Sequence, residues 1–326
     1  MQQLTLIARQ VIVITGASSG VGRVMATELA AYGARLVLTA RRESALEEVA
    51  RECRELGADV RVEVADTRVA AQVEAVASAA IGEYGRIDVW INNAGVLAAG
   101  ELDQIPQEVN ENVIRTNLIG YINGAHAALP HFKRQGRGIL INNISMGGWF
   151  PSPHAAAYTA SKFGIRGFSE ALKGELRKYR EIHVVDLYPG FLDTPGVHHA
   201  ANYTGKVIKP APPVYDPRKV AREIIELIRH PRPVRAIGAS SVFLRLAYAL
   251  LPATTRSVTD IFIRAYLRQA DNMENTPGNV VEPVAYGTSA DGGWRRHYTP
   301  GAKGITLSVA ALSAGLLLMR HLASKK

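Results

Sequence analysis

Three side chains in the middle of this 326-residue chain have the types and spacing that proton transfer requires. Tyr158 and Lys162 lie four residues apart in a run that predicts a helix, and Ser145 lies thirteen residues before Tyr158. Residues four apart share one helical face, so the ammonium can stand near the phenol. A phenol titrates with a pKa of about 10, and a nearby positive charge lowers that pKa. A tyrosine tuned in this way can exchange a proton with a substrate oxygen.

A glycine-rich turn near the N-terminus predicts a site for phosphate groups. Residues 9–15 form an apolar, β-branched run that predicts a buried strand, and the turn Thr15–Gly22 (TGASSGVG) follows it and opens a predicted helix. Its glycines let backbone N–H groups approach a pyrophosphate at the helix N-terminus, where the helix dipole favours anions. The order strand, turn and helix strengthens this interpretation.

A tyrosine–lysine pair also occurs on ordinary exposed helices, but here it accompanies a series of other motifs. In chain order the motifs are Thr15–Gly22 (TGxxxGxG), Asn92–Gly95 (NNAG), Asn117, Ser145, Tyr158 with Lys162 (YxxxK), and Pro189–Gly190. In order and spacing they resemble the short-chain dehydrogenase/reductase family, from about residue 9 to residue 239. The resemblance implies an oxidoreductase that transfers a hydride between a nicotinamide cofactor and a carbonyl or secondary alcohol.

Short apolar runs alternate with helix-length segments along the same part of the chain. This alternation predicts an α/β fold, a doubly wound (Rossmann-type) parallel sheet that binds its ligand at the carboxyl ends of the strands. The predicted strands are 9–15, 36–39, 60–64, 87–91, 139–143, 182–188 and 234–237, and helices include 45–56, 69–84 and 218–229.

The resemblance assigns a role to each of four candidate catalytic residues. Tyr158 is the acid–base group, and Lys162 lowers its pKa while binding the nicotinamide ribose. Ser145 binds the substrate oxygen and stabilises developing charge. Asn117 holds a water that connects Lys162 to solvent.

The expected cofactor is NADP(H). An acid normally binds the ribose 2′-hydroxyl of NAD after the second strand, but that position is Ala40, followed by Arg41 and Arg42. Guanidinium groups suit a 2′-phosphate instead. By resemblance Asp66 binds adenine, a role compatible with capping the next helix. The predicted cofactor residues are Gly16, Ser18, Ser19, Gly20, Val21, Gly22, Arg41, Arg42, Asp66, Asn93, Ala94, Gly95, Tyr158, Lys162, Pro189, Gly190 and Thr194.

Composition narrows the class of protein. The net charge of +9 is spread over scattered basic residues among acids, and no nucleic-acid motif is present, so we expect no nucleic-acid partner. The single cysteine, Cys53, excludes a disulfide framework and fits a reducing compartment. A strand begins within a few residues of the start, so we expect no signal peptide and a cytoplasmic protein. No acid or cysteine completes a metal site around His198 and His199, so we expect no metal. We interpret both histidines as substrate-lid or surface residues.

The resemblance predicts a catalytic domain over residues 1–240. Beyond it, where the family motifs are absent, we expect an extension over 241–300 and an apolar tail over 301–326. In the extension we expect helices at 242–251 and 258–270, broken by Pro252, and an irregular linker at 272–298. Residues 305–319 are fifteen uncharged residues, whereas a membrane span needs about twenty. We interpret this tail as a membrane anchor whose flanking charges can snorkel; the alternative is a helix packed on the core or on a second subunit.

The sequence thus predicts an NADP(H)-dependent reductase, a homo-oligomer, acting on an apolar small-molecule ketone or alcohol such as a lipid, steroid-like or aromatic ketone. We expect the substrate pocket at residues 94–99, 146–153 and 191–207. One alternative is a catalytically silent, NADPH-binding regulatory protein of the same fold; the complete Ser–Tyr–Lys–Asn set argues against it. An epimerase or dehydratase on this fold is a third option, disfavoured by the glycine turn.

Overall fold

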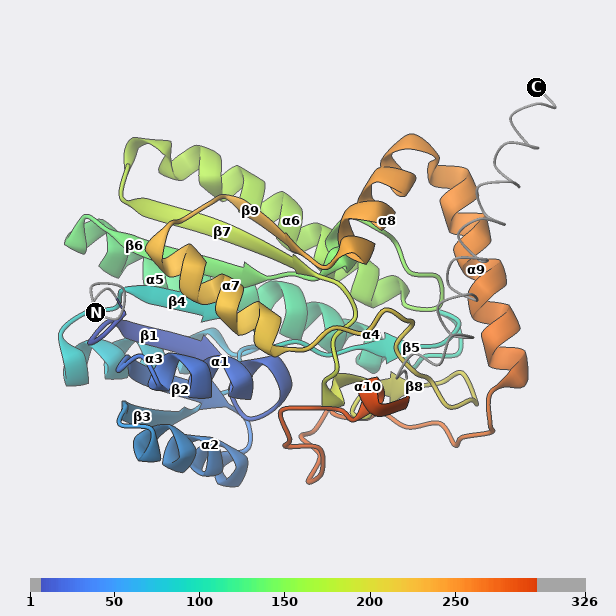
Figure 1. Cartoon of the computed structure of the whole chain (residues 1–326), viewed down its shortest axis with the longest axis horizontal. Helices are drawn as coiled ribbons and strands as arrows, with labels where there is room; N and C mark the ends of the chain where they lie inside the picture. Colours follow the sequence, from blue (N-terminus) through green and yellow to red (C-terminus); the bar gives the residue numbers. More distant parts are fainter. Residues whose placement is uncertain (1–6, 298–326) are drawn as a thin grey trace.

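The computed structural model describes residues 7–297, and its centre is a seven-stranded parallel sheet in the order β3-β2-β1-β4-β6-β7-β9. Helices cover both faces of this sheet (Figure 1). The prediction of a doubly wound parallel sheet is therefore confirmed. The strands are β1 (Val11–Thr15), β2 (Arg35–Ala40), β3 (Asp59–Val64), β4 (Val89–Asn92), β6 (Gly138–Asn143), β7 (Ile182–Pro189) and β9 (Val234–Ile237).

The strands alternate their side chains between two hydrophobic layers. In β1, Ile12 and Ile14 pack with one layer, and Val13 packs with the other. Both layers are buried, as the almost continuous apolar runs of a parallel sheet predict. One layer contains helices α1 (Gly20–Ala30), α2 (Glu43–Glu55) and α7 (Arg218–Arg229); the other contains α3 (Ala70–Tyr84), α5 (Gly120–Gln135) and α6 (Ala156–Glu175).

The direction of winding reverses at β1, which pairs with β2 on one side and β4 on the other. Ligands of doubly wound sheets bind at this switch point, outside the carboxyl ends of the strands. Four smaller elements lie beyond that edge of the sheet, in Figure 1 on its right-hand side. They are α4 (Gln107–Ile114), a π-helix at Arg115–Ile119, and the two-residue strands β5 (Ala98–Ala99) and β8 (Ala201–Asn202), which pair with each other.

Element boundaries differ from the sequence predictions by a few residues. The first strand begins at Val11, because Arg9 adopts a φ of +66° and its N–H bonds to the Gly33 carbonyl at 2.8 Å. The prediction that Asp66 could cap the following helix is wrong: α3 begins at Ala70, with Val69 at its N-cap position.

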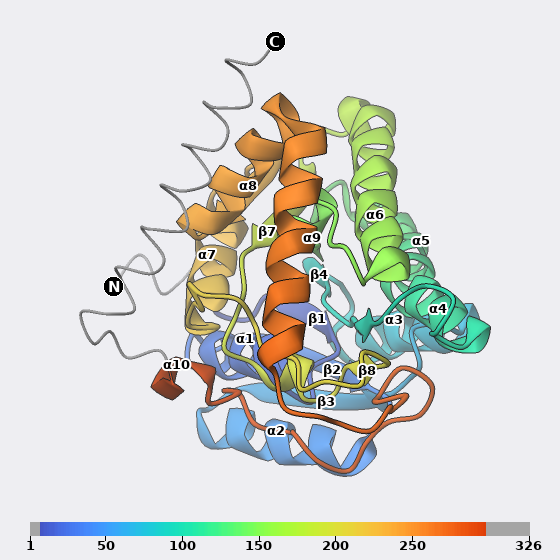
Figure 2. The ribbon, with the colours of Figure 1, turned by 90° about the vertical axis from the view of Figure 1, so that its right-hand side faces the viewer.

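The extension begins with two helices, as predicted, α8 (Ala239–Leu250) and α9 (Pro252–Gln269). Pro252 occupies the first turn of α9, where its missing N–H costs nothing. We call residues 271–295 the strap. From the lower end of α9 the strap returns along the bottom of the molecule, past α2, to α10 (Trp294–His297) (Figures 1 and 2). The strap is irregular, as expected, and it packs against the core along its length, which the sequence pattern did not predict.

The predicted membrane tail, residues 301–326, lies outside the described residues. Within residues 7–297, no helix is long and apolar enough to cross a membrane.

Candidate active site

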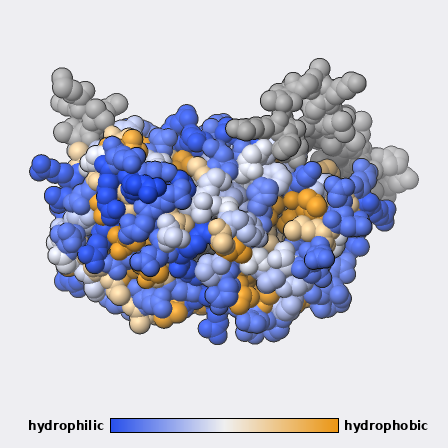
Figure 3. Space-filling view, turned by 90° about the horizontal axis from the view of Figure 1, so that it is seen from below, coloured by the Kyte–Doolittle hydropathy of each residue, from blue (hydrophilic) through white to orange (hydrophobic). Residues whose placement is uncertain are grey.

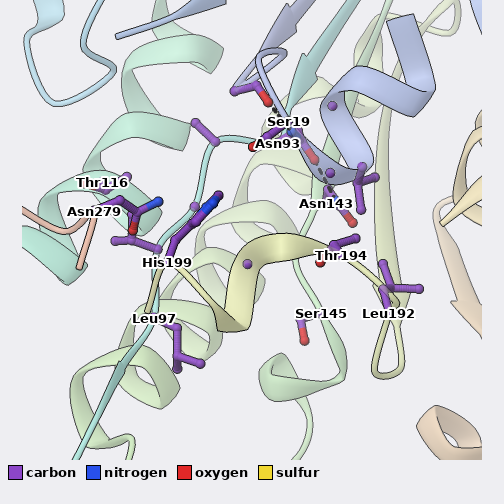
Figure 4. A pocket seen from close by; sticks show the side chains of 18 of the residues that line it. Ser19, Asn93, Leu97, Thr116, Asn143, Ser145, Leu192, Thr194, His199 and Asn279 are labelled. Atoms are coloured by element: carbon purple, nitrogen blue, oxygen red, sulfur yellow. Dashed lines mark hydrogen bonds between the residues drawn. The ribbon is translucent and has the colours of Figure 1, made fainter. Parts of the chain in front are cut away.

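A cavity of about 440 Å³ lies at the carboxyl ends of the strands and runs from the glycine-rich turn to Tyr158. This volume is within the usual range for small-molecule and cofactor sites. Every predicted site residue except Asn117 lines it, so the structure brings together side chains from seven separate stretches of the chain. Figure 4 shows Ser19, Asn93, Asn143, Ser145 and Thr194 around it.

The glycine-rich turn is as tight as its sequence predicts. A Cβ atom at position 22 would lie 2.1 Å from the Gly16 carbonyl oxygen, and one at position 16 would lie 2.8 Å from the Ala94 Cα. Thr15 fixes the neighbouring loop, because its hydroxyl accepts hydrogen bonds from the Asn93 and Ala94 N–H groups at 2.9 and 3.1 Å. The turn and the NNAG loop therefore form one rigid wall, which leaves the N-terminus of α1 facing the cavity.

Tyr158 and Lys162 lie on one face of α6 at the inner end of the cavity. The Lys162 Nζ lies 5.6 Å from the centroid of the Tyr158 ring and 5.3 Å from that of Tyr121. Lys162 is only 4% exposed. The ammonium thus stands beside the phenol, in contact with aromatic faces that favour a cation.

Burial dominates the proton equilibria of this pair. It raises the pKa of Tyr158, against a hydrogen bond with Ser145 that lowers it. It also lowers the pKa of Lys162 to about 7. In the protein without cofactor the pKa of Tyr158 is therefore raised and not lowered as expected, because burial outweighs the hydrogen bond with Ser145.

Ser145 adopts a φ of +100°, a conformation that costs free energy for a residue with a side chain. Its hydroxyl accepts a hydrogen bond from the Gly147 N–H at 3.2 Å. Such strain is concentrated at functional sites, and the Ser145 side chain forms a hydrogen bond with Tyr158.

Asn117 lies in the π-helix behind the cavity and is fully buried. Its carboxamide accepts from the Val96 N–H at 2.8 Å and donates to the Val96 carbonyl and the Ser161 hydroxyl at 2.9 and 3.0 Å. The side chain thus joins the loop after β4 to α6, one turn from Tyr158. A π-helix in an otherwise α-helical segment is frequent at functional sites.

Arg41 and Arg42 line the opposite end of the cavity, next to Asp66. Neither arginine forms an ion pair with a carboxylate of residues 7–297; both donate to carbonyl oxygens of the strap. Burial lowers the pKa of Arg41. Burial alone would raise the pKa of Asp66, but two hydrogen bonds from Arg68 lower it overall. Partly buried guanidinium groups that form no direct ion pair with a carboxylate suit an anion.

Sequence reasoning missed the contribution of the strap. Asn279, Pro283, Val284 and Tyr286 line the cavity, and Figure 4 shows Asn279 near His199 at its edge. The signal available was a segment unusually rich in glycine and proline, which is typical of close backbone approaches as well as of linkers. Of the two histidines, His199 is buried and lines the cavity, and the ring of His198 stacks on that of Trp294.

Comparison with known proteins identifies the class of this site. The family model described as short chain dehydrogenase matches residues 10–203. The chain is 34% identical to "Uncharacterized oxidoreductase YxnA" of Bacillus subtilis, over 94% of this chain and 89% of that protein. A solved actinorhodin polyketide ketoreductase with NADPH is 29% identical over 71% of this chain and 95% of that one, with a TM-score of 0.64.

A second solved structure, a short chain dehydrogenase/reductase from Burkholderia phymatum in complex with NAD, is 26% identical and has a TM-score of 0.65. The match covers 82% of this chain and 99% of that one. The chain therefore belongs to the short-chain dehydrogenase/reductase family. It is an oxidoreductase with a nucleotide-cofactor site at the switch point of its sheet.

Proposed function

We propose that this protein is an NADP(H)-dependent reductase of carbonyl groups in apolar small molecules. In the reverse direction it oxidises the corresponding secondary alcohols. The observation that carries the proposal is one cavity with Arg41 and Arg42, which form no direct ion pair with a carboxylate of residues 7–297, at one end and Ser145, Tyr158 and Lys162 at the other. The residues present fit the cofactor: the glycine-rich turn at the N-terminus of α1 suits a pyrophosphate, and the arginines suit a 2′-phosphate.

Tyr158 is the proton donor in this proposal. The nicotinamide, when bound, supplies the hydride. The Ser145 hydroxyl donates a hydrogen bond to the substrate oxygen and stabilises the charge that develops there. The Tyr158 phenol gives its proton to the same oxygen, and its raised pKa keeps it protonated at neutral pH. Lys162 supports the phenolate that remains, and Asn117 holds the relay toward solvent.

The preference for NADP(H) over NAD(H) rests on charge. The end of β2 carries Ala40 where an acid would bind the 2′-hydroxyl, and Arg41 and Arg42 follow it. Desolvation lowers the pKa of Arg41, so the site gains more from a phosphate dianion than a solvated surface would. A charge-assisted hydrogen bond is worth about 1.5–3 kcal/mol, or roughly tenfold or more in affinity.

The walls around Ser145 favour an apolar substrate. Leu97, Met146, Phe150, Phe191 and Val197 line this end of the cavity. They come from the three segments in which we expect the substrate pocket. The similar solved structure of a polyketide ketoreductase supports a ketone as the substrate.

Turnover by the wild type and by one variant distinguishes this function from the alternative, a catalytically silent NADPH-binding regulatory protein. We expect turnover of ketones with NADPH, and Tyr158→Phe should lower the rate by about 10²–10⁴-fold, the usual contribution of general acid catalysis. NADPH binding should stay within a few-fold, because the phenyl ring remains. The measurement is NADPH consumption across a panel of aliphatic, aromatic and steroid-like ketones. A variant with more than half the wild-type rate, or a wild type without turnover, would revive the regulatory alternative.

We also propose that helices α8 and α9 rest on a lipid surface containing anionic head groups. Leu246, Leu250, Ile261 and Phe262 are each more than half exposed, and Leu250 is 76% exposed. The two helices also carry arginines, and the whole chain has a net charge of +9. An apolar face with flanking basic residues suits a membrane interface. Cosedimentation with phosphatidylserine vesicles tests binding of these two helices to lipid. If the protein self-associates but does not bind vesicles, the apolar face of α8 and α9 is instead the interface of the homo-oligomer that we expect.

A further inference from the structure

The strap binds the arginines at the 2′-phosphate end of the cavity. Arg41 donates to the carbonyl oxygens of Asn279 and Val281 at 2.5 and 3.2 Å, and Arg42 donates to that of Val284. Carbonyl oxygens orient a guanidinium group without neutralising its charge. The strap therefore holds these side chains in place and leaves their charge available to an anion.

The same segment also crosses the N-terminus of α1. The Ser289 carbonyl accepts from the Gly20 N–H at 2.9 Å, and the Thr288 carbonyl accepts from Arg23 at 2.8 Å. The strap thus passes over both phosphate-binding regions of the cavity, the glycine turn and the arginine pair. Both lie within the predicted cofactor site.

Beyond the glycine turn, the strap fastens the lid that follows β7. Asp193 receives hydrogen bonds from the N–H groups of Trp294 and Arg295 at 2.7 and 3.2 Å. The indole of Trp294 donates to the Thr194 carbonyl at 3.1 Å and stacks on His198, with ring centroids 4.3 Å apart. The strap therefore connects the adenosine end of the cavity with the segment that closes its nicotinamide end.

Three glycines of the strap show how closely it lies on the lid. A Cβ atom at position 278 would come within 2.1 Å of the His199 carbonyl oxygen, and one at position 287 within 1.8 Å of the His199 Nε2. At position 292 it would lie 2.3 Å from the Thr194 carbonyl oxygen. Such contacts are those of a packed element, and Val280 between them is fully buried.

An ion-pair network anchors the end of the strap. Arg218, at the start of α7, binds both carboxylate oxygens of Asp291 at 2.9 Å. Arg295 binds Asp193, Asp216 and Asp291 at 3.0, 2.8 and 3.3 Å. Asp193 is buried, but Arg218, Asp216, Asp291 and Arg295 are partly exposed. On the face of the molecule seen from below, hydrophilic side chains cover most of the surface and apolar ones lie in separate patches (Figure 3). The anchor can be weakened without opening the core.

We propose that the strap is part of the cofactor site: it closes over the adenosine 2′-phosphate end of bound NADP(H) and positions Arg41 and Arg42 for that phosphate. The proposal rests on the NADP(H) function proposed above. Cofactor release then requires the strap to open. The strap carbonyls contribute to the choice between NADP(H) and NAD(H) through the arginines they hold, so Asn279, Val281 and Val284 are positioning residues.

Two strap variants and a matched control test the proposal in the full-length protein. Trp294→Ala removes the contacts with Thr194 and His198, and Asp291→Asn weakens the anchor. Glu223→Gln is the control. Like the pair of Arg218 and Asp291, Arg235 and Glu223 form a bidentate ion pair, but this pair lies away from the strap. Stopped-flow displacement gives the NADPH dissociation rate, which should rise about tenfold in Trp294→Ala and less in Asp291→Asn, since affinity changes within one site lie mostly in that rate.

A second readout separates positioning of the arginines from a general loss of stability. Both strap variants should lose more affinity for NADP⁺ than for NAD⁺, because only NADP⁺ carries the 2′-phosphate. An equal loss for both cofactors, or a dissociation rate equal to that of the control, would overturn the proposal.

Limited proteolysis tests the wild type without any substitution. Tyr286 lies exposed in the strap and is followed by Gly287, so chymotrypsin cuts after it when the segment opens locally. Saturating NADP⁺ should slow this cut more than saturating NAD⁺ does. Cleavage at the same rate with and without NADP⁺ would contradict closure over the cofactor. If the wild type binds NADPH but these tests fail, only the strap proposal is lost; if the wild type does not bind NADPH, the proposed function itself is lost.

Discussion

Replacing Lys162 with methionine should make the cofactor-free protein more stable near neutral pH and remove part of its pH dependence. Lys162 is 4% exposed, and burial lowers its pKa from 10.5 to about 7. Between these two values the unfolded chain binds a proton on Lys162 that the folded protein does not. Stability of the wild type therefore rises with pH across that window, and the destabilisation is fully present below pH 7.

The size of the effect follows from the pKa shift. One pKa unit corresponds to about 1.4 kcal/mol, so a displacement from 10.5 to about 7 corresponds to roughly 5 kcal/mol at its limit. Between pH about 7.5 and 9.5 the folded lysine is mostly neutral and the unfolded one mostly charged, so the contribution of Lys162 to the free energy of unfolding should rise by about 2 kcal/mol. The raised pKa of Tyr158 acts only above its ordinary value and does not enter this window.

Urea unfolding at several pH values in this window measures the effect. The quantity of interest is the difference in unfolding free energy between wild type and Lys162→Met, which should shrink as the pH rises. Lys178→Met, which removes an exposed ammonium, is the matched control. A difference between wild type and Lys162→Met that stays constant over the window would show that Lys162 remains charged inside the protein, and the reasoning from burial would be wrong.

Two other predictions concern the ends of the site and of the chain. The double substitution Ala40→Asp and Arg41→Asp should invert the preference from NADPH to NADH, because it removes one partner of the 2′-phosphate and places two acids against it. The test compares the Michaelis constants for NADPH and NADH. An unchanged ratio of these two constants would contradict the prediction. Removal of residues 301–326 should release the protein from carbonate-washed membranes. It should leave ketone turnover intact, because every proposed catalytic residue precedes residue 163. If the full-length protein is absent from the membrane fraction, or the truncated protein is unfolded, the prediction of a membrane anchor is wrong.

The core of the fold was predictable because its signals are local. The apolar runs of a buried parallel sheet and the glycine-rich turn between β1 and α1 each consist of residues that are consecutive in the sequence. Their positions then fix the switch point, which is why residues as distant as Gly16 and Lys162 could be assigned to one site before the structure was known. The structure places both on the wall of the same cavity.

The strap and the proton equilibria could not be predicted in this way. Residues 271–295 have neither helical nor strand periodicity, and their order comes from contacts with Arg41, Asp193 and Arg218, which are far away in the sequence. Likewise, spacing predicts that Lys162 approaches Tyr158, but the direction of both pKa shifts depends on burial, which is a property of the assembled fold.

The most direct test of the proposed function is the ratio of kcat/KM for NADPH to that for NADH, measured with a ketone that the wild type reduces. A preference for NADPH of about tenfold or more is expected from at least one charge-assisted hydrogen bond to the 2′-phosphate. Equal use of both cofactors, or a preference for NADH, would contradict the assignment of Arg41 and Arg42.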